Sequence, residues 1–141
     1  MSTDFDEIAE NFAFLEDWEE RYRYLIELGK AMPPLPAALR TEGARVHGCA
    51  SQVWLVPRLE GSGASTRIAF DGDSDAMIVR GLIALLRSLV NNRPAQEVAA
   101  LDVQAALAAL DLASHLSAQR SNGLYAMVAR VKEIAASAVT A

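Results

Sequence analysis

The sequence predicts an α+β fold in which several helices pack against a small antiparallel sheet of about three strands. Apolar residues recur at helical spacing near both ends and in the middle of the chain. The stretch from Ala44 to Asp71 has instead the β-branched and alternating composition of strands. A length of 141 residues with 52% hydrophobic content suits one compact core, and no linker separates a second unit. Residues 1–141 are therefore expected to form a single domain.

Two helices are expected before the first proline. Ser2 to Asp4 can cap the first helix, which carries apolar residues on one side: Phe5, Ile8, Phe12 and Leu15. Asp17 and Glu20 have the spacing of a capping box for the second. Gly29 is expected to end that helix, because the prolines at positions 33, 34 and 36 prevent its continuation.

Two strands are expected after these helices. The run from Val53 to Val56 is β-branched and aromatic, and Pro57 marks its end or an edge position. Gly61 to Gly63 would turn the chain into a second strand at Arg67 to Phe70. Arg45 to His47 could supply a third short strand.

The helix expected from Ser74 to Asn91 is apolar over most of its circumference, which predicts that it forms the centre of the core. Asp73 or Ser74 is expected to cap it, with Asp75 in the first turn, where the helix dipole favours a carboxylate.

Three further helices are expected near the C-terminus. Pro94 would open a short one, Asp102 would cap another, and a long one would follow Ser117. The long helix has apolar residues at near-ideal spacing: Leu124, Met127, Val128, Val131, Ile134, Ala135 and Ala138.

The charge balance argues against several classes of partner. The net charge is -5, whereas a protein that binds duplex nucleic acid needs a basic surface. The N-terminus lacks the basic and apolar regions of a secretory signal, and arginines interrupt the most apolar window, Ala76 to Val90. We expect a cytoplasmic protein that binds neither nucleic acid nor a membrane.

Cys49 is the single cysteine, so no disulfide can form within the chain. It follows Gly48 between two expected strands, which places it at the tip of a turn. A lone cysteine is either an inert buried thiol or a reactive one, and His47 could share a strand face with it and form a thiolate–imidazolium pair. Cys49, His47 and the distant His115 are too few ligands for structural zinc or an iron–sulfur cluster.

Other apparent motifs do not carry chemistry. Asp71, Asp73 and Asp75 alternate as in a calcium loop, but Ala76 and Leu82 stand where glycine and glutamate are required. The glycine-rich stretch at residues 61–65 lacks the Lys-Ser/Thr of a phosphate-binding loop. For Arg120, at the start of the long helix, a solvated side chain, a partner contact and an ion pair with an aspartate all remain open.

The stretch VHGCASQVWL at residues 46–55 resembles the cysteine-loop signature of the SufE family and its paralogue CsdE. Three further segments agree in order and spacing: WEERYRYLIELG from Trp18, GDSDAMIVRGLIALL from Gly72 and HLSAQRSNGLYAM from His115. The resemblance implies a SufE/IscU-like fold. It also implies that Cys49 accepts sulfane sulfur from a PLP-dependent cysteine desulfurase of the SufS or CsdA type. The sulfur would then pass to a cluster-assembly scaffold such as SufBCD. PLP would belong to the desulfurase, and the chain itself would need no cofactor.

The resemblance implies that the functional residues lie around the cysteine. Cys49 would be the catalytic residue, and the loop or docking environment would comprise His47, Gly48, Ser51, Gln52, Asp73, Asp75 and Arg120. Ala50 stands where the family often has glutamine. Two alternatives remain open: a non-covalent activator of a desulfurase in which Cys49 is structural, and a cysteine hydrolase that uses Cys49 and His47.

Overall fold

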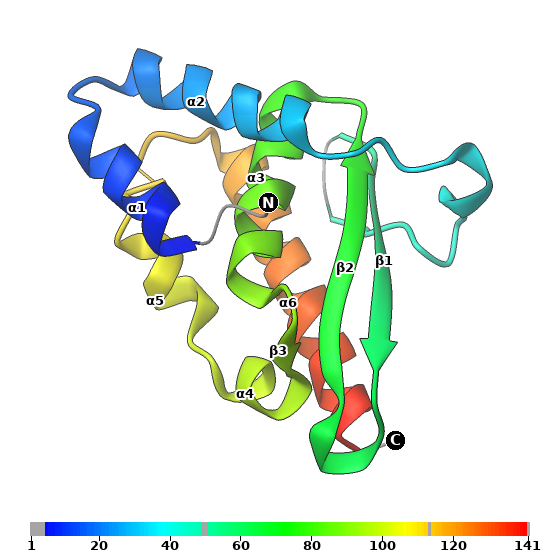
Figure 1. The fold of residues 1–141 in the computed structure, drawn as a ribbon. Coiled ribbons are helices and arrows are strands. Elements are labelled where there is room, and N and C mark those ends of the chain that lie inside the picture. Colours follow the sequence, from blue (N-terminus) through cyan, green and yellow to red (C-terminus); the bar gives the residue numbers. More distant parts are fainter. Residues whose placement is uncertain (1–4, 49–50, 113, 141) are drawn as a thin grey trace.

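A computed structural model describes residues 5–48, 51–112 and 114–140. Cys49 and Ala50 lie outside the described residues, as does the cap expected at Ser2 to Asp4. The predicted fold class is confirmed, because helices pack against a three-stranded antiparallel sheet (Figure 1).

The two N-terminal helices are α1, Phe5–Phe14, and α2, Trp18–Ala31. Asp17 caps α2 as predicted, since its carboxylate accepts the backbone N–H of Glu20 at 2.8 Å. The predicted stop at Gly29 is wrong, because α2 continues to Ala31. Gly29 serves instead as a contact point: a Cβ there would lie 2.8 Å from the backbone nitrogen of Gly81.

The sheet consists of β1 (Val53–Glu60), β2 (Arg67–Ser74) and β3 (Arg93–Pro94), in the order β1-β2-β3. The long strands pair from Val53 with Ser74 to Glu60 with Arg67. The turn between them contains a short 3₁₀ helix, η2 (Gly63–Ser65). Pro57 lies within β1, an edge strand, where its missing N–H is tolerated.

The third strand is not where the sequence suggested. Arg45 forms only an isolated bridge with Trp54, next to a hydrogen bond from the N–H of Val46 to the carbonyl of Val53 at 2.9 Å. The strand that completes the sheet is β3, which pairs with Arg67 and Ile68 of β2. Two residues are too few to leave an alternating pattern, so β3 had no local signal in the sequence.

The central helix α3 spans Met77–Val90 and begins later than predicted, because β2 continues through Ser74. Its N-cap is Ala76, which makes no side-chain capping bond. The predicted caps Asp73 and Ser74 are therefore wrong, and Asp75 precedes the helix. The burial prediction holds for eight residues of α3: Val79, Gly81, Leu82, Ile83, Leu85, Leu86, Leu89 and Val90.

The remaining helices are α4 (Ala95–Ala100), α5 (Val103–Ala108) and α6 (Ala118–Thr140), and a short 3₁₀ helix, η1 (Ala37–Leu39), lies between α2 and β1. Pro94 is the N-cap residue of α4, and the carboxylate of Asp102 accepts the N–H of Ala105, as predicted. The hydroxyl of Ser117 accepts the N–H of Arg120 at 3.2 Å at the start of α6.

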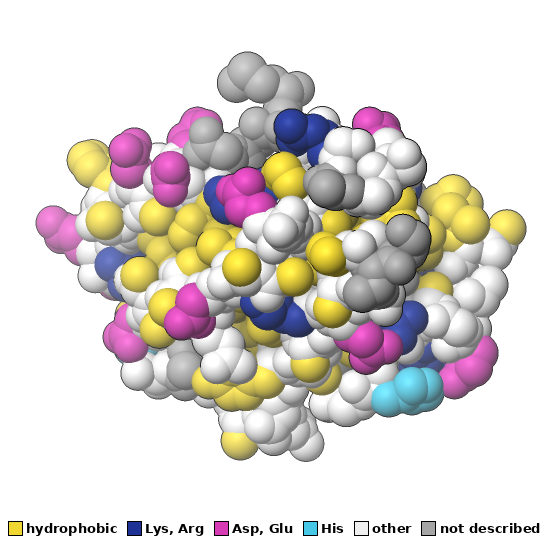
Figure 2. All heavy atoms as spheres, turned by 90° about the horizontal axis from the view of Figure 1, so that it is seen from below, with side chains coloured by type: hydrophobic (Ala, Val, Ile, Leu, Met, Phe, Trp, Pro, Cys, Tyr) yellow, Lys and Arg dark blue, Asp and Glu magenta, His cyan; other side chains and the backbone are white. Residues whose placement is uncertain are grey.

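The elements are arranged so that α3 and α6 lie beside the sheet and α2 runs across the end of α3 (Figure 1). Residues 33–45, which follow α2, extend beyond the sheet (Figure 1), and we call this segment the arm. The face seen from below exposes hydrophobic side chains across its middle, with acidic and basic side chains interspersed around them (Figure 2). Among the described helices, none has both the length and the apolar character needed to cross a bilayer.

Candidate functional site

The N-terminal flank of Cys49 is fixed by a glycine. Gly48 has a φ of +96°, a backbone conformation that disfavours any other residue. A Cβ at Gly48 would lie 3.3 Å from the Cβ of Ala126, so the chain passes close to α6 at this point. Val46, two residues earlier, is tied to β1 through its hydrogen bond to Val53, so the described chain that ends at Gly48 is held at two points.

The C-terminal flank is held by a carboxylate. The backbone N–H of Gln52 donates to Oδ1 of Asp75 at 3.0 Å, which links the end of the cysteine segment to the turn between β2 and α3. Because Asp75 comes directly after a strand and directly before the N-cap of α3, its position is set by two regular elements.

A small hollow lies beside this flank. Ser51 and Arg120 belong to its lining, together with Val79, Leu82, Gln119, Gly123 and Met127. Its volume is about 20 Å³, enough for roughly one water-sized group. The buried side chains of Leu82 and Met127 make it apolar on the side of the core, while the exposed Arg120 is the charged residue of its lining.

Arg120 is exposed at the start of α6. Within residues 5–48, 51–112 and 114–140, no ion pair joins its guanidinium to an aspartate. Of the three alternatives for Arg120, the described part of the chain gives no support to an ion pair with an aspartate, and a solvated side chain and a partner contact stay open.

His47 interacts with Glu42, whose Oε1 lies 3.3 Å from Nε2 of the imidazole. Both side chains are largely exposed, at 73% and 77%, so solvent screens this contact and leaves the pair free to move. The predicted pairing of His47 with Cys49 falls on a residue outside the described part.

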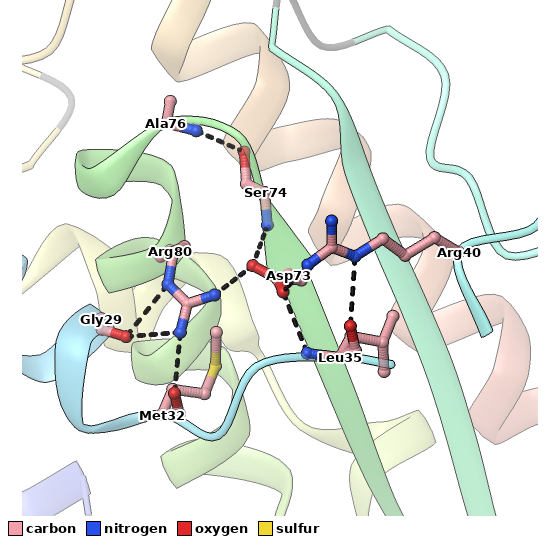
Figure 3. Close-up of polar contacts among 8 residues, drawn as sticks. All are labelled: Gly29, Met32, Leu35, Arg40, Asp73, Ser74, Ala76 and Arg80. Atoms are coloured by element: carbon pink, nitrogen blue, oxygen red, sulfur yellow. Dashed lines mark hydrogen bonds and ion pairs between the residues drawn. The ribbon is translucent and has the colours of Figure 1, made fainter. Parts of the chain in front are cut away.

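Asp73 is only 2% exposed and lies on β2 opposite Trp54. Its carboxylate accepts hydrogen bonds from four groups: the backbone N–H groups of Leu35 and Ser74 and the guanidinium groups of Arg40 and Arg80 (Figure 3). Burial alone would raise the pKa of Asp73, but the backbone bonds and Arg80 outweigh it and hold this pKa below its ordinary value.

Five of the predicted site residues thus belong to the chain on either side of residues 49–50 or contact its C-terminal part: Gly48, Ser51, Gln52, Asp75 and Arg120. His47 contacts Glu42, and Asp73 is buried. The arginines at positions 40 and 80 were not among the predicted site residues. Arg80 had left a signal, because it is one of the two arginines that interrupt the apolar sequence of α3.

Metal binding has no support from the described residues. No three of their His, Cys, Asp or Glu side chains lie close enough together to hold an ion.

Known proteins resemble this chain over nearly its whole length. Residues 6–135 match the family model SufE, described as an Fe-S metabolism associated domain. A SufE-like protein of Rhizobium etli is 51% identical over 128 residues, covering 91% of this chain and 86% of that protein. A SufE-like protein of Rhizobium meliloti is 45% identical over 130 residues, covering 92% of this chain and 93% of the relative. Both relatives carry the word uncharacterized in their names.

The fold agrees with a solved structure as well. The solution structure of a hypothetical protein from Thermus thermophilus matches with a TM-score of 0.77 and 22% identity, covering 97% of this chain and 96% of the other. That identity supports the fold alone. From the match of the family model over nearly the whole length and from the two close relatives, the chain belongs to the SufE family of Fe-S metabolism associated domains.

Proposed function

We propose that the protein is a sulfur carrier: Cys49 takes persulfide sulfur from a PLP-dependent cysteine desulfurase and delivers it to iron–sulfur cluster assembly. The observation that supports the proposal is that the described chain is anchored on both sides of residues 49–50, which include the single cysteine. Gly48 turns the chain beside α6, and Gln52 is held by Asp75. Membership of a family associated with Fe-S metabolism gives this thiol its chemical context.

The transfer step is a thiol–persulfide exchange. The Cys49 thiolate attacks the outer sulfur of the desulfurase persulfide, a bond forms between Cys49 Sγ and that sulfur, and the sulfur–sulfur bond on the desulfurase breaks. The desulfurase cysteine leaves as a thiolate, so no external oxidant or reductant is needed. Since the chain has one cysteine, no second thiol of its own can attack the loaded persulfide and release sulfide.

Placement contributes more to this step than activation of the thiol. Lowering a thiol pKa from about 8.5 to about 7 gains roughly 15-fold in thiolate at neutral pH but loses roughly fivefold in nucleophilicity. Holding the two sulfurs together can instead supply an effective molarity on the order of 10⁵ M. The anchored flanks and the exposed Arg120 support docking as the source of rate, in a transient complex with a SufS- or CsdA-type desulfurase and later with a scaffold of the SufBCD type.

The test is intact mass spectrometry after the protein is mixed with a cysteine desulfurase, PLP and cysteine. We expect the wild-type chain to gain the mass of one sulfur atom and the Cys49→Ser variant to gain none. Treatment with a thiol reductant should remove the increment. The proposal is wrong if a desulfurase shown to be loaded leaves the mass of the wild-type chain unchanged.

The same mixture separates the alternatives. A non-covalent activator would raise alanine production equally with the Cys49→Ser variant when an independent thiol reductant is present. A cysteine hydrolase would turn over an ester or amide and gain no sulfur. It would also need a rigid base, which the exposed pair of His47 and Glu42 does not provide.

A further inference from the structure

We propose that Asp73 is a positioning residue for sulfur transfer, because its one buried carboxylate fixes both segments that hold the flanks of Cys49. The inference rests on the proposed role of Cys49 as acceptor and adds a residue to it. Asp73 acts indirectly on the chain around Cys49. It acts through Arg40 on one side and through the turn that carries Asp75 on the other.

The N-terminal side depends on Arg40. Its guanidinium donates to Oδ2 of Asp73 at 2.8 Å and to the carbonyl of Leu35 at 3.2 Å, and it lies over the ring of Trp54 at 5.4 Å from the centroid. The N–H of Leu35 also donates to Oδ2 of Asp73, at 2.9 Å. Asp73 thus fastens both ends of the short segment from Leu35 to Arg40 (Figure 3).

This segment is linked through Trp54 to the chain that precedes Cys49. Trp54 is the cross-strand partner of Asp73 and also bridges to Arg45, three residues before Gly48. Arg40 therefore contacts the same tryptophan that pairs with the chain entering the turn. If Asp73 no longer held Arg40, the arm would lose its charged attachment to the sheet.

The C-terminal side depends on the turn after β2. Oδ1 of Asp73 accepts the N–H of Ser74 at 2.8 Å, and the hydroxyl of Ser74 accepts the N–H of Ala76 at 3.2 Å. These two bonds shape the turn that presents Asp75 to the N–H of Gln52. The same carboxylate oxygen also accepts a bond from Arg80.

Arg80 connects Asp73 to α2. Its side chain is 12% exposed, and besides Asp73 it donates to the carbonyls of Gly29 and Met32, at 2.9 and 2.7 Å. A buried guanidinium needs its counter-charge, so neutralising Asp73 would loosen the end of α2, where the arm begins. Four groups from three parts of the chain thus converge on one carboxylate, an arrangement suited to holding a reactive segment in place.

A matched control lies two residues earlier on the same strand. Asp71 pairs with Arg58 of β1, Nε to Oδ2 at 3.0 Å, and with Arg87 of α3, Nη2 to Oδ1 at 3.3 Å. Asp71 thus also has two arginine partners, but it lies opposite Val56. One partner belongs to β1 and the other to α3, and neither belongs to the arm or to the turn before α3. Asp71 is 39% exposed where Asp73 is buried, and Asp71→Asn removes a carboxylate with two arginine partners without addressing the cysteine segment.

The experiment compares Asp73→Asn, Arg40→Gln and Asp71→Asn at a temperature well below each melting midpoint. We measure the rate at which iodoacetamide alkylates Cys49 and the dependence of the sulfur transfer rate on desulfurase concentration. For Asp73→Asn and Arg40→Gln we expect the alkylation rate to change by about threefold or more and the maximal transfer rate to fall by about tenfold. Asp71→Asn should leave both rates within about twofold of wild type, even where its melting midpoint falls.

The inference is overturned if Asp73→Asn alters only the melting midpoint, or if Asp71→Asn alters both rates equally. Should Asp73→Asn fail to fold, Arg40→Gln decides alone, because Arg40 is 39% exposed and its substitution leaves Arg80 as a partner of Asp73; unchanged rates in that variant refute the role. Alkylation needs no desulfurase. It therefore tests the effect of Asp73 on Cys49 even if the chain accepts no sulfur and the proposed function fails.

Discussion

Gly81 of α3 lies directly against the carbonyl of Leu25 in α2, and a Cβ on Gly81 would come within 2.7 Å of the carbon of that carbonyl group. Gly29 makes the reciprocal contact one turn later on α2. The absence of two side chains thus lets the helix backbones touch, and this closeness allows Arg80 to reach the carbonyl of Gly29. The position of the ion pair between Arg80 and Asp73 therefore depends on the contact between the two helices.

We predict that Gly81→Ala lowers the free energy of unfolding by about 2 to 3 kcal/mol, the usual cost of forcing extra volume into a packed site. Helix propensity alone would make alanine about 1 kcal/mol more favourable than glycine, so the sign separates the clash from propensity. Urea denaturation checks the change. Gly43→Ala is the control, because the nearest atom to its Cβ would be Oγ1 of Thr41 at 3.9 Å. A Gly81→Ala variant as stable as wild type would contradict the contact.

The bond between Asp75 and Gln52 should control the exposure of the cysteine. In Asp75→Ala the N–H of Gln52 loses its acceptor, so the segment after Cys49 is less restrained, and we expect alkylation of Cys49 to accelerate by about two- to tenfold. The exposed residue Glu16 offers a control, since Glu16→Ala removes a carboxylate without touching this segment. Equal alkylation rates in Asp75→Ala and wild type would show that the bond does not restrain the cysteine.

His47 and Arg120 should differ in their importance for transfer. His47 is exposed and pairs with Glu42, so His47→Ala should change the transfer rate by no more than about threefold. Arg120→Glu reverses the charge in the lining of the hollow beside Ser51 and should lower the rate by about tenfold or more, mainly through weaker association. Stopped-flow assays at two salt concentrations measure the transfer rates of both variants. The opposite ranking would favour base catalysis by His47 over docking.

Stability should depend on pH through Asp73. Because its folded pKa lies below the unfolded value of 3.8, the ionised carboxylate stabilises the fold above that value, and the stabilisation is lost as the pH falls through the folded pKa. In thermal unfolding, the stability difference between wild type and Asp73→Asn should be constant above about pH 5. This difference should shrink below about pH 4. A difference that grows on acidification would have the wrong sign for a carboxylate held ionised.

Local patterns in the sequence were sufficient for most of the fold. The caps at Asp17 and Asp102 and the edge proline Pro57 depend on neighbours within a few residues, so their spacing identifies them. Gly29 and Asp73 were assigned the wrong roles because their partners are distant in sequence. A glycine near a helix end resembles a stop, and an aspartate before a helix resembles a cap. Only packing against α3 and the convergence of two arginines on Asp73 show otherwise.

Lys132 of α6 supports a helix end that has no side-chain cap of its own. Its ammonium group donates to the carbonyls of Val98, Ala99 and Leu101 at the end of α4. The last carbonyls of a helix lack partners within it, so we expect Lys132→Met to lower the free energy of unfolding by about 1 to 2 kcal/mol.

The matched variant is Lys30→Met. Lys30 is also a helical lysine, but its side chain is 59% exposed and its ammonium lies 3.6 Å from Glu27, a pair that should contribute less than about 0.5 kcal/mol. Chemical denaturation of both variants gives the comparison. If the two substitutions cost the same, the carbonyls at the end of α4 are satisfied equally well by water, and the short helix is held by the burial of Val98 rather than by the charge on α6.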